Sequence, residues 1–507
     1  MIKKHQPQTL GTHYKKAFKF RFYPESEDIV ALQQTFGCAR FVYNKVLDYS
    51  IKHYASRQHT VTDDYGDLII IPNMKYKPLS STDRINYITE LKILYPWLKE
   101  VTSIALQQSI IGLNNAYNKF FDNVKKIKGS NKNKDKVKSY GYPNFKKRGG
   151  RNSFKILGKA SIHFNKDGSF TLPKFKKPLK IKFSRGFNKD KVSSVTIIKE
   201  PSGHYYISFL SEDNYKRLPS INNKIGFDSG ISNTFTSYSD SNNNNISNNL
   251  NNKGLNNIQI PDLSSIIKKI KDLNRSMSKK MKGSNNRNKA RAKLAKAYEK
   301  KNNIVNDFYH KLSSTIVNEN QVIIGENLNI AQMKSINNSL INNSLINNDL
   351  NNKKLKNIRS SLQNISLGKL YNYIEYKSKW YGKTFIKADK YYPSSKLCSQ
   401  PNCGYINHAL KLEDRAWQCP DCGTRHDRDH NSAVNLYNYD ENNAKVVIKK
   451  VLAYHSKMKK NNIGLNIKSD ITNSLQLTQY KNKSAPGTVV DAYGEHVILK
   501  SNLGRAL

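Results

Sequence analysis

The first clear pattern in the chain lies over residues 14–24. Apolar and basic side chains alternate there, which places aromatic rings on one face and charges on the other. The alternating run is Phe18, Lys19, Phe20, Arg21 and Phe22. A period of two predicts a half-buried strand.

The pattern changes to helical spacing at Pro24, which can open a helix. Apolar residues then recur at steps of three and four. They are Ile29, Leu32, Phe36, Ala39, Tyr43 and Val46, and later Leu106, Ile110, Leu113, Tyr117, Phe120 and Val124. We therefore expect residues 25–139 to form a helical, helix-turn-helix-like region.

Strand patterns return in residues 140–220. Short apolar runs flank turns at Asp167-Gly168 and at Pro201-Ser202-Gly203, which predicts two hairpins. Together with the strand at 14–24, these hairpins can close a small barrel or pack as a curved sheet. We predict a β-barrel-like module.

Residues 221–440 have the pattern of an α/β domain. Apolar strands at 224–228 and 321–326 flank a long helical stretch, which glycine and polar residues at 283–286 break into a helical hairpin. Two asparagine-rich tracts, at 241–258 and 335–357, have too few apolar residues to fold and are interpreted as flexible insertions. We expect the tail at 441–507 to be partly disordered.

Composition indicates the kind of partner. The 507 residues carry 85 Lys and Arg against 38 Asp and Glu, a formal charge of +47, which favours a nucleic acid partner. No apolar run approaches the ~18 residues that span a bilayer, so an integral membrane protein is excluded and only a basic membrane-surface protein stays open. Five cysteines do not make a disulfide framework, and a reduced, intracellular setting is expected.

A basic loop follows the first helical region. Lys146, Lys147 and Arg148 lie beside Tyr142 and Phe145. Cations interleaved with aromatic rings suit contacts to nucleic acid phosphates, and a solvated loop explains them equally well.

Four of the five cysteines are clustered. Cys398, Cys403, Cys419 and Cys422 have the spacing C-x4-C, then fifteen residues, then C-x2-C, and Gly404 and Gly423 follow two of them. This spacing predicts a structural, tetrahedral Zn²⁺ site, with His408 and His426 as substitute ligands. Cys38, on the first predicted helix, is expected in the core.

Three acids stand out by their position. Asp228 and Glu326 each end an apolar strand, and Asp429 follows the cysteine cluster just before a predicted helix. If the strand ends meet at one edge of a sheet, the carboxylates repel one another unless a divalent cation such as Mg²⁺ neutralises them. Taken singly, each acid is also compatible with a turn or a helix cap.

The ordered motifs together resemble the TnpB family, the OrfB-type proteins of insertion-sequence transposons, which are relatives of type V CRISPR effector nucleases. The resemblance covers about residues 15–440. Its motifs are Lys19-Phe20-Arg21-Phe22-Tyr23-Pro24, Cys38-Ala39-Arg40-Phe41-Val42-Tyr43-Asn44, Pro143-Asn144-Phe145-Lys146, Gly226-Phe227-Asp228-Ser229-Gly230-Ile231, Gly325-Glu326-Asn327-Leu328-Asn329, Pro393-Ser394-Ser395-Lys396 with the cysteines, and Asp427-Arg428-Asp429-His430-Asn431-Ser432-Ala433.

The resemblance implies a multidomain α+β chain: an RNase H-like (RuvC-like) nuclease domain at 221–440, with a zinc ribbon at 394–426. It implies a Mg²⁺-binding triad of Asp228, Glu326 and Asp429, with Asp427 as the alternative third acid, and zinc ligands at the four clustered cysteines. The chain departs from the family pattern in its longer first cysteine spacing and in Ser432, where alanine is usual.

Our first hypothesis is therefore an RNA-guided, Mg²⁺-dependent DNA endonuclease of a mobile element, with a guide RNA and target DNA as partners and no membrane. A nuclease-inactive nucleic-acid-binding regulator of transposition is the second. A DNA transposase that performs strand transfer itself is the third, because an acid triad also supports that chemistry.

Overall fold

The computed structural model describes residues 14–62, 68–72, 76–129, 141–158, 161–213, 217–230, 233–239, 258–328, 360–411, 413–460, 488–490 and 496–498. Most of the chain forms one compact unit, made of residues up to 117 and 142–462. A second unit comprises 118–141 and 463–507; its described residues are the end of helix α3 (Ser103–Gly129), Gly141, and the strand pair β15 (Thr488–Val490) and β16 (His496–Ile498). No helix among the described residues is both long and apolar enough to cross a bilayer.

The N-terminal strand belongs to a four-stranded antiparallel sheet with the order β1-β8-β7-β4. Its strands are β1 (Tyr14–Phe22), β4 (Asn152–Leu157), β7 (Val192–Lys199) and β8 (Tyr205–Asp213), and a short pair, β5 (His163–Phe164) and β6 (Phe170–Thr171), lies outside it. The three phenylalanines of β1 are buried, as the alternation predicted.

This sheet is open, so the expected barrel is not closed. Among the described strands, β1 and β4 form opposite edges and do not pair with each other. The apolar face is covered instead by the first helix, through Leu32 and Phe36, and by rings from a loop, such as Phe187 stacked 5.2 Å from Phe18. A period of two specifies which face is buried, but closure depends on pairing between the first and last strands.

The helical region contains α1 (Ser26–Ala55), α2 (Ser81–Leu94), the 3₁₀ helix η1 (Pro96–Glu100) and α3. Val42, Leu91 and Ile110 belong to its core, and Cys38 is buried there as expected. Between α1 and α2 lies a hairpin, β2 (Gln58–Thr62) and β3 (Leu68–Pro72), which the sequence pattern did not predict.

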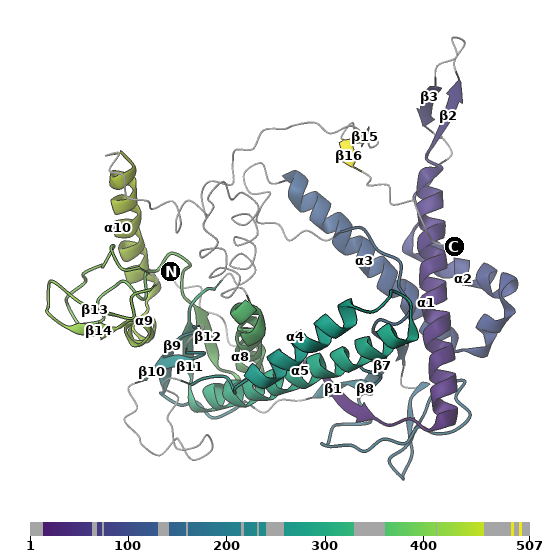
Figure 1. Ribbon diagram of the computed structural model, residues 1–507, viewed down its shortest axis with the longest axis horizontal. Helices are drawn as coiled ribbons and strands as arrows, with labels where there is room; N and C mark the ends of the chain where they lie inside the picture. The colour runs from purple at the N-terminus through teal and green to yellow at the C-terminus, as the bar shows by residue number, and fades with distance from the viewer. Residues whose placement is uncertain are drawn as a thin grey trace. The chain divides into compact units, whose positions relative to one another are not determined.

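The second large sheet has the order β10-β9-β11-β12 (Figure 1). Its strands are β9 (Lys224–Asp228), β10 (Thr236–Tyr238), β11 (Val322–Gly325) and β12 (Thr384–Lys387). The strands β9, β11 and β12 run parallel, and β10 is antiparallel to β9. The described parts of the long connections that these parallel strands require are largely helical.

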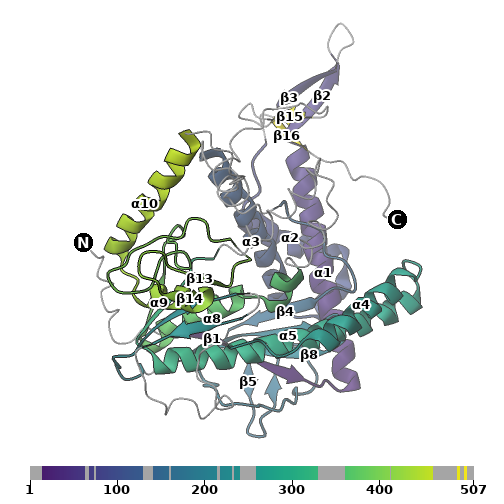
Figure 2. The same ribbon diagram turned by 60° about the vertical axis from the view of Figure 1, so that its left-hand side comes forward.

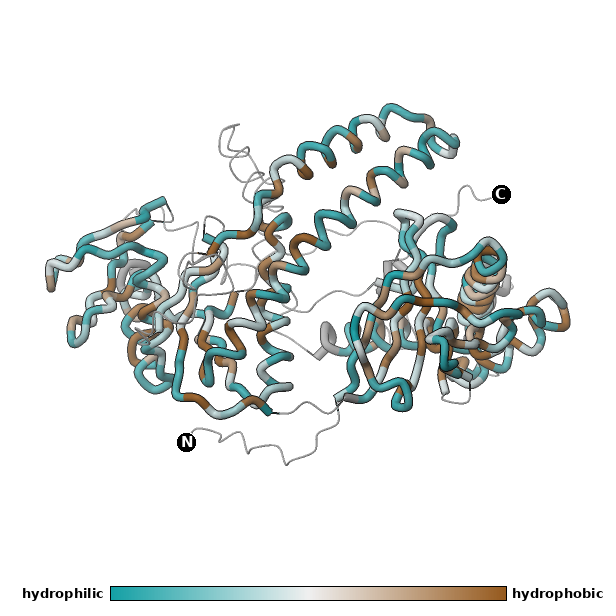
Figure 3. Tube along the Cα trace, turned by 90° about the horizontal axis from the view of Figure 1, so that it is seen from below, coloured by the Kyte–Doolittle hydropathy of each residue, from teal (hydrophilic) through white to brown (hydrophobic). Residues whose placement is uncertain are grey.

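Helices α4 (Ser264–Ser278), α5 (Asn285–Glu319) and α8 (Gly368–Tyr381) share one core with this sheet, which includes Phe227, Ile323 and Ile374. The helices α4 and α5 form the expected hairpin, and apolar positions recur along both of them (Figure 3). Helix α9 (Arg428–Tyr437) packs against β9 and β10. Two short strands, β13 (Ala416–Gln418) and β14 (Arg425–Asp427), lie beside α9 (Figure 2).

The tail begins with a helix, α10 (Glu441–Lys460), so its first twenty residues are ordered rather than irregular. Apart from β15 and β16, the rest of the tail, which was predicted to be partly disordered, lies outside the described residues. The asparagine-rich tracts at 241–258 and 335–357 also lie outside them, except for Ile258.

The last residue of α5 provides a test of stability against pH. Burial raises the pKa of Glu319 to about 7, and its Oε2 atom has no hydrogen-bond partner among the described groups. A helix C-terminus also disfavours negative charge. The folded chain thus holds this proton up to about pH 7, whereas the unfolded chain releases it near the ordinary value of 4.5. Stability is therefore lost as the pH rises from 4.5 through 7.

We expect Glu319→Gln to stabilise the fold at pH 8 by on the order of 1 kcal/mol and to have little effect at pH 4, where the carboxyl is neutral in both states. Urea unfolding at the two pH values checks this. Glu90→Gln on the exposed surface of α2 is the control and should change stability at neither pH. Equal effects of Glu319→Gln at pH 4 and pH 8 would contradict the argument.

Candidate functional site

The three predicted acids lie on different elements that meet at one edge of the second sheet. Asp228 is the last residue of β9, and Glu326 follows β11 directly. The parallel register places Gly325 opposite Phe227, so the next residue of each strand is an acid. Asp429 lies in the first turn of α9, which packs against β9.

Asp228 and Glu326 are both half-buried, and their carboxyl groups lie close enough to act electrostatically on each other. The Ser229 backbone N–H donates to Asp228 Oδ1 at 2.7 Å, and the Ser394 hydroxyl donates to Glu326 Oε1 at 2.5 Å. Burial raises the pKa of Asp228 well above its usual range, and the negative charges of Glu326 and Asp429 raise it further. Burial also raises the pKa of Glu326. A bound cation would reverse this effect by favouring the ionised carboxylates.

The two aspartates at the start of α9 have different environments. Asp429 accepts a hydrogen bond from Asn233 Nδ2 at 3.3 Å, lies 3.7 Å from Arg415 Nη1, and acts electrostatically on Asp228. Asp427 is exposed and caps α9, because its carboxylate accepts the His430 backbone N–H at 2.8 Å. The geometry therefore favours Asp429 over Asp427 as the third acid.

The sequence did not predict two further features of this site. A Cβ atom on Gly226 would lie 2.1 Å from the Tyr437 backbone N and 2.5 Å from the Ala433 carbonyl oxygen, so only glycine lets α9 approach β9 this closely. Ser394 and Ser432 both place hydroxyls where they favour the ionised form of Glu326. The Ser432 contact is loose, since its buried Oγ makes no hydrogen bond of good geometry among the described groups.

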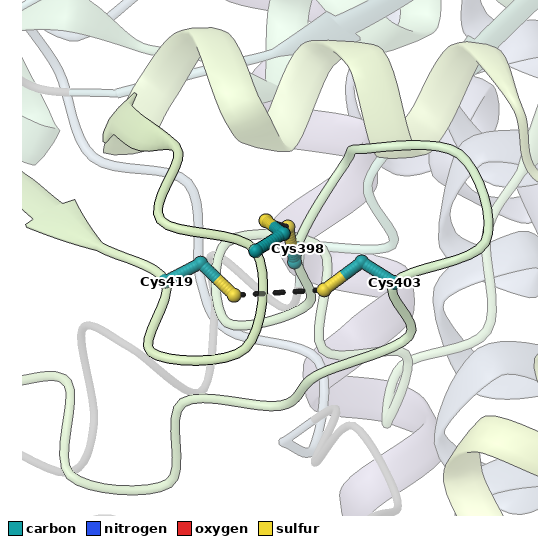
Figure 4. A group of neighbouring side chains, drawn as sticks. Cys398, Cys403 and Cys419 are labelled. Carbon is teal, nitrogen blue, oxygen red and sulfur yellow. Dashed lines mark hydrogen bonds between the residues drawn. The ribbon is translucent and has the colours of Figure 1, made fainter.

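The four clustered cysteines form a compact group whose Sγ atoms all lie within 4.8 Å of one another. The thiols of Cys403 and Cys419 point toward each other and are 3.5 Å apart, with Cys398 beside them (Figure 4). Cys398 and Cys422 are 3.6 Å apart. This arrangement can hold one thiophilic metal ion, and the longer C-x4-C spacing does not prevent the four thiols from meeting.

The two predicted substitute ligands differ in position. His426 is buried, and its Nε2 atom lies 3.1 Å from Cys398 Sγ, next to the cluster. The His408 ring stacks on Tyr454 with 3.7 Å between centroids and is not part of the cluster. Gly404 and Gly423 have φ values of 69° and 71°, the left-handed conformation that such turns require.

The basic loop is exposed and joined to α1. The side chains of Lys146, Lys147 and Arg148 are exposed. Lys146 Nζ lies 3.9 Å from the centre of the Tyr43 ring, and its backbone N–H donates to Asn44 Oδ1 at 2.8 Å. The loop therefore presents cations at a fixed place on the helical region.

Comparison with known proteins gives three family matches. A model described as a probable transposase of the IS605 OrfB type matches residues 206–337, a helix-turn-helix model of the same type matches 14–59, and a Cas12f1-like TNB domain matches 368–436. The chain belongs to the TnpB family, the OrfB-type proteins of insertion sequences, as the sequence motifs indicated.

Among individual relatives, a Streptomyces pristinaespiralis protein named "Putative RNA-guided DNA endonuclease" is 29% identical over 423 residues, 83% of this chain and 88% of the relative. The InsQ protein of Escherichia coli K12, with the same description, is 23% identical over 83% of this chain and 91% of its own length. The virulence protein VsdF of Salmonella dublin is 36% identical over 107 residues, which cover 21% of this chain and 82% of VsdF. A solved Cas12f1–sgRNA–target DNA complex aligns with 84% of this chain and 99% of its own chain at 15% identity and a TM-score of 0.37.

Proposed function

We propose that this protein is an RNA-guided DNA endonuclease of a mobile element, which cleaves phosphodiester bonds by a divalent-metal, three-carboxylate mechanism. The observation that carries the proposal is the convergence of Asp228, Glu326 and Asp429 at one sheet edge in a chain of charge +47. The parallel strands β9, β11 and β12, with β10 antiparallel at the edge, support an RNase H-like domain. Relatives described as RNA-guided DNA endonucleases support the same activity.

The residues of the acidic site fit Mg²⁺, because hard cations prefer carboxylate oxygens. Two bound Mg²⁺ ions would supply an activated water and stabilise the leaving oxygen of the phosphodiester. The chain itself orients the carboxylates: the Ser229 N–H fixes Asp228, Ser394 fixes Glu326, and Asn233 fixes Asp429. Burial raises the pKa of both Asp228 and Glu326, so a bound cation would compete with protons for these carboxylates.

The partners in this proposal are a guide RNA and a target DNA. Base pairing with the guide reads most of the target, while the protein reads a short flanking motif. Exposed cations, among them Lys146, Lys147 and Arg148, contact phosphates. Binding should therefore weaken steeply as salt is raised.

The cysteine cluster is proposed to hold a structural Zn²⁺ in the ribbon at 394–426. All four positions are thiols, so the site is closed and does not take part in the reaction. We expect Cys419→Ala to reduce the zinc content from about one equivalent to near zero and to unfold the ribbon, because metal binding supplies much of the folding energy of such a small element. Elemental analysis and limited proteolysis check this. Cys38→Ala is the matched control and should retain zinc, since Cys38 lies in the helical core.

The decisive experiment is cleavage of a plasmid library by the protein co-expressed with RNA from its own locus, as wild type and as Asp228→Ala. We expect cuts at a guide-matched site with the wild type and Mg²⁺ only. Co-purified RNA without cleavage by either protein would favour the nuclease-inactive regulator. Joined DNA strands in place of cut ends would favour a transposase acting directly.

A further inference from the structure

Helix α9 is hydrogen-bonded to residues 394–399, the segment that contains the first cysteine of the cluster. The side-chain amides of Asn431 and Asn435 lie four residues apart and so share a helix face. Asn435 Nδ2 donates to the carbonyls of Ser394 at 2.8 Å and of Leu397 at 2.6 Å. Asn431 Nδ2 donates to the Leu397 carbonyl at 2.8 Å, and its Oδ1 accepts the Ser399 backbone N–H at 3.1 Å.

Both asparagines are buried, with 1% and 4% of their surface exposed, so these bonds are protected from water. We call Asn431 and Asn435 the amide bracket. Because α9 also carries Asp429, the bracket fixes residues 394–399 relative to the third acid.

The bracketed segment reaches both metal-binding groups. At its start, the buried Ser394 hydroxyl donates to Glu326 Oε1 at 2.5 Å. Four residues later, Cys398 supplies a thiol to the cysteine cluster. A carboxylate with one oxygen hydrogen-bonded has a fixed orientation, and loss of such an outer partner commonly weakens metal binding.

We propose that Ser394 is a positioning residue for Glu326, and that the amide bracket makes divalent-metal binding at the acids depend on an intact cysteine cluster. This inference rests on the proposed function, because it takes Glu326 as a ligand of the divalent metal. The cysteine cluster thereby affects the acidic site through the protein backbone, although the metal ion in the cluster takes no part in the reaction.

The test measures Mn²⁺ binding to the purified full-length protein by electron paramagnetic resonance, with Mn²⁺ alone as the probe. We expect Ser394→Ala to weaken Mn²⁺ binding about 10-fold with an unchanged melting temperature. Ser394→Thr, which keeps the hydroxyl, should restore binding. Ser395→Ala, the same change one residue away, should bind as the wild type does. Wild-type affinity in Ser394→Ala, or equal losses in Ser394→Ala and Ser395→Ala, would overturn the positioning role.

A second arm tests the dependence on the cluster. The double variant Cys403→Ser/Cys422→Ser removes half of the thiols and should also bind Mn²⁺ about 10-fold more weakly. Wild-type Mn²⁺ affinity in this variant would overturn the dependence. The variant Asp228→Ala separates this inference from the proposed function. If Asp228→Ala binds Mn²⁺ as the wild type does, the proposed metal site at the acids is wrong. If Asp228→Ala loses Mn²⁺ binding while the Ser394 and cysteine variants keep it, the metal site stands and only the roles of Ser394 and the amide bracket are wrong.

Discussion

Asp429→Ala is expected to lower guide-dependent DNA cleavage by at least about 1,000-fold, because it removes one of three groups that hold the metal as a unit. The neighbouring acid provides a matched control. Asp427→Ala removes the N-cap of α9, where Asp427 accepts the His430 N–H, and should cost about 1 kcal/mol of stability while cleavage persists. Cleavage rates of the two variants, with urea unfolding of each, check both expectations.

The reverse result would change the assignment of the site. If Asp427→Ala abolished cleavage at an unchanged fold and Asp429→Ala did not, the third ligand would be Asp427, and α9 would have to rotate when the metal binds. Guide RNA binding by both variants should equal that of the wild type, since neither residue belongs to the basic loop. A variant that fails to bind RNA would report misfolding rather than loss of the metal site.

Gly226→Ala is expected to destabilise the fold by on the order of 3 kcal/mol or more and to abolish cleavage. The added methyl group would meet backbone atoms of Tyr437 and Ala433 at 2.1 and 2.5 Å, and backbone cannot move aside as a flexible side chain can. Relief requires α9 to move away from β9, which also takes Asp429 away from Asp228. Urea unfolding and the plasmid cleavage assay check the two effects.

The matched control is Gly112→Ala, a glycine on the exposed side of α3. Apart from its chain neighbours and the backbone of its own helix, no described atom lies within 4 Å of the position its Cβ would take, so alanine should stabilise the helix by up to about 1 kcal/mol. If Gly226→Ala kept wild-type stability, the close packing of α9 on β9 would be wrong.

Local patterns in the sequence predicted the elements that hold the acids. An apolar run ending in an acid predicted β9 and β11, and the helical spacing predicted α1 and the α4–α5 hairpin. The cysteine spacing predicted the cluster, because two short turns bring each pair of thiols together. The roles of these site residues in catalysis and metal binding remain predictions.

Other features depend on partners far along the chain and have no local signal. The tight approach at Gly226 involves residues 433–437, and the open edge of the first sheet depends on which strands pair. The family motif already favoured Asp429 over Asp427, and the cap geometry of α9 adds the physical reason, because Asp427 caps the helix. Ser394 was quoted as part of a motif, but its contact with Glu326 required the fold.

The position of Asp429 on α9 has a consequence for biosynthesis. The first acid leaves the ribosome about 200 residues before the third, since they are residues 228 and 429 of the chain. Domains fold as their residues emerge, so the first sheet and the helical region can form while the acidic site still lacks α9. A chain that ends between Glu326 and Asp429 therefore carries the basic loop and the first two acids without a complete metal site. In the proposed nuclease, such a chain would have the residues proposed to bind nucleic acid before it has all of those proposed to cut it.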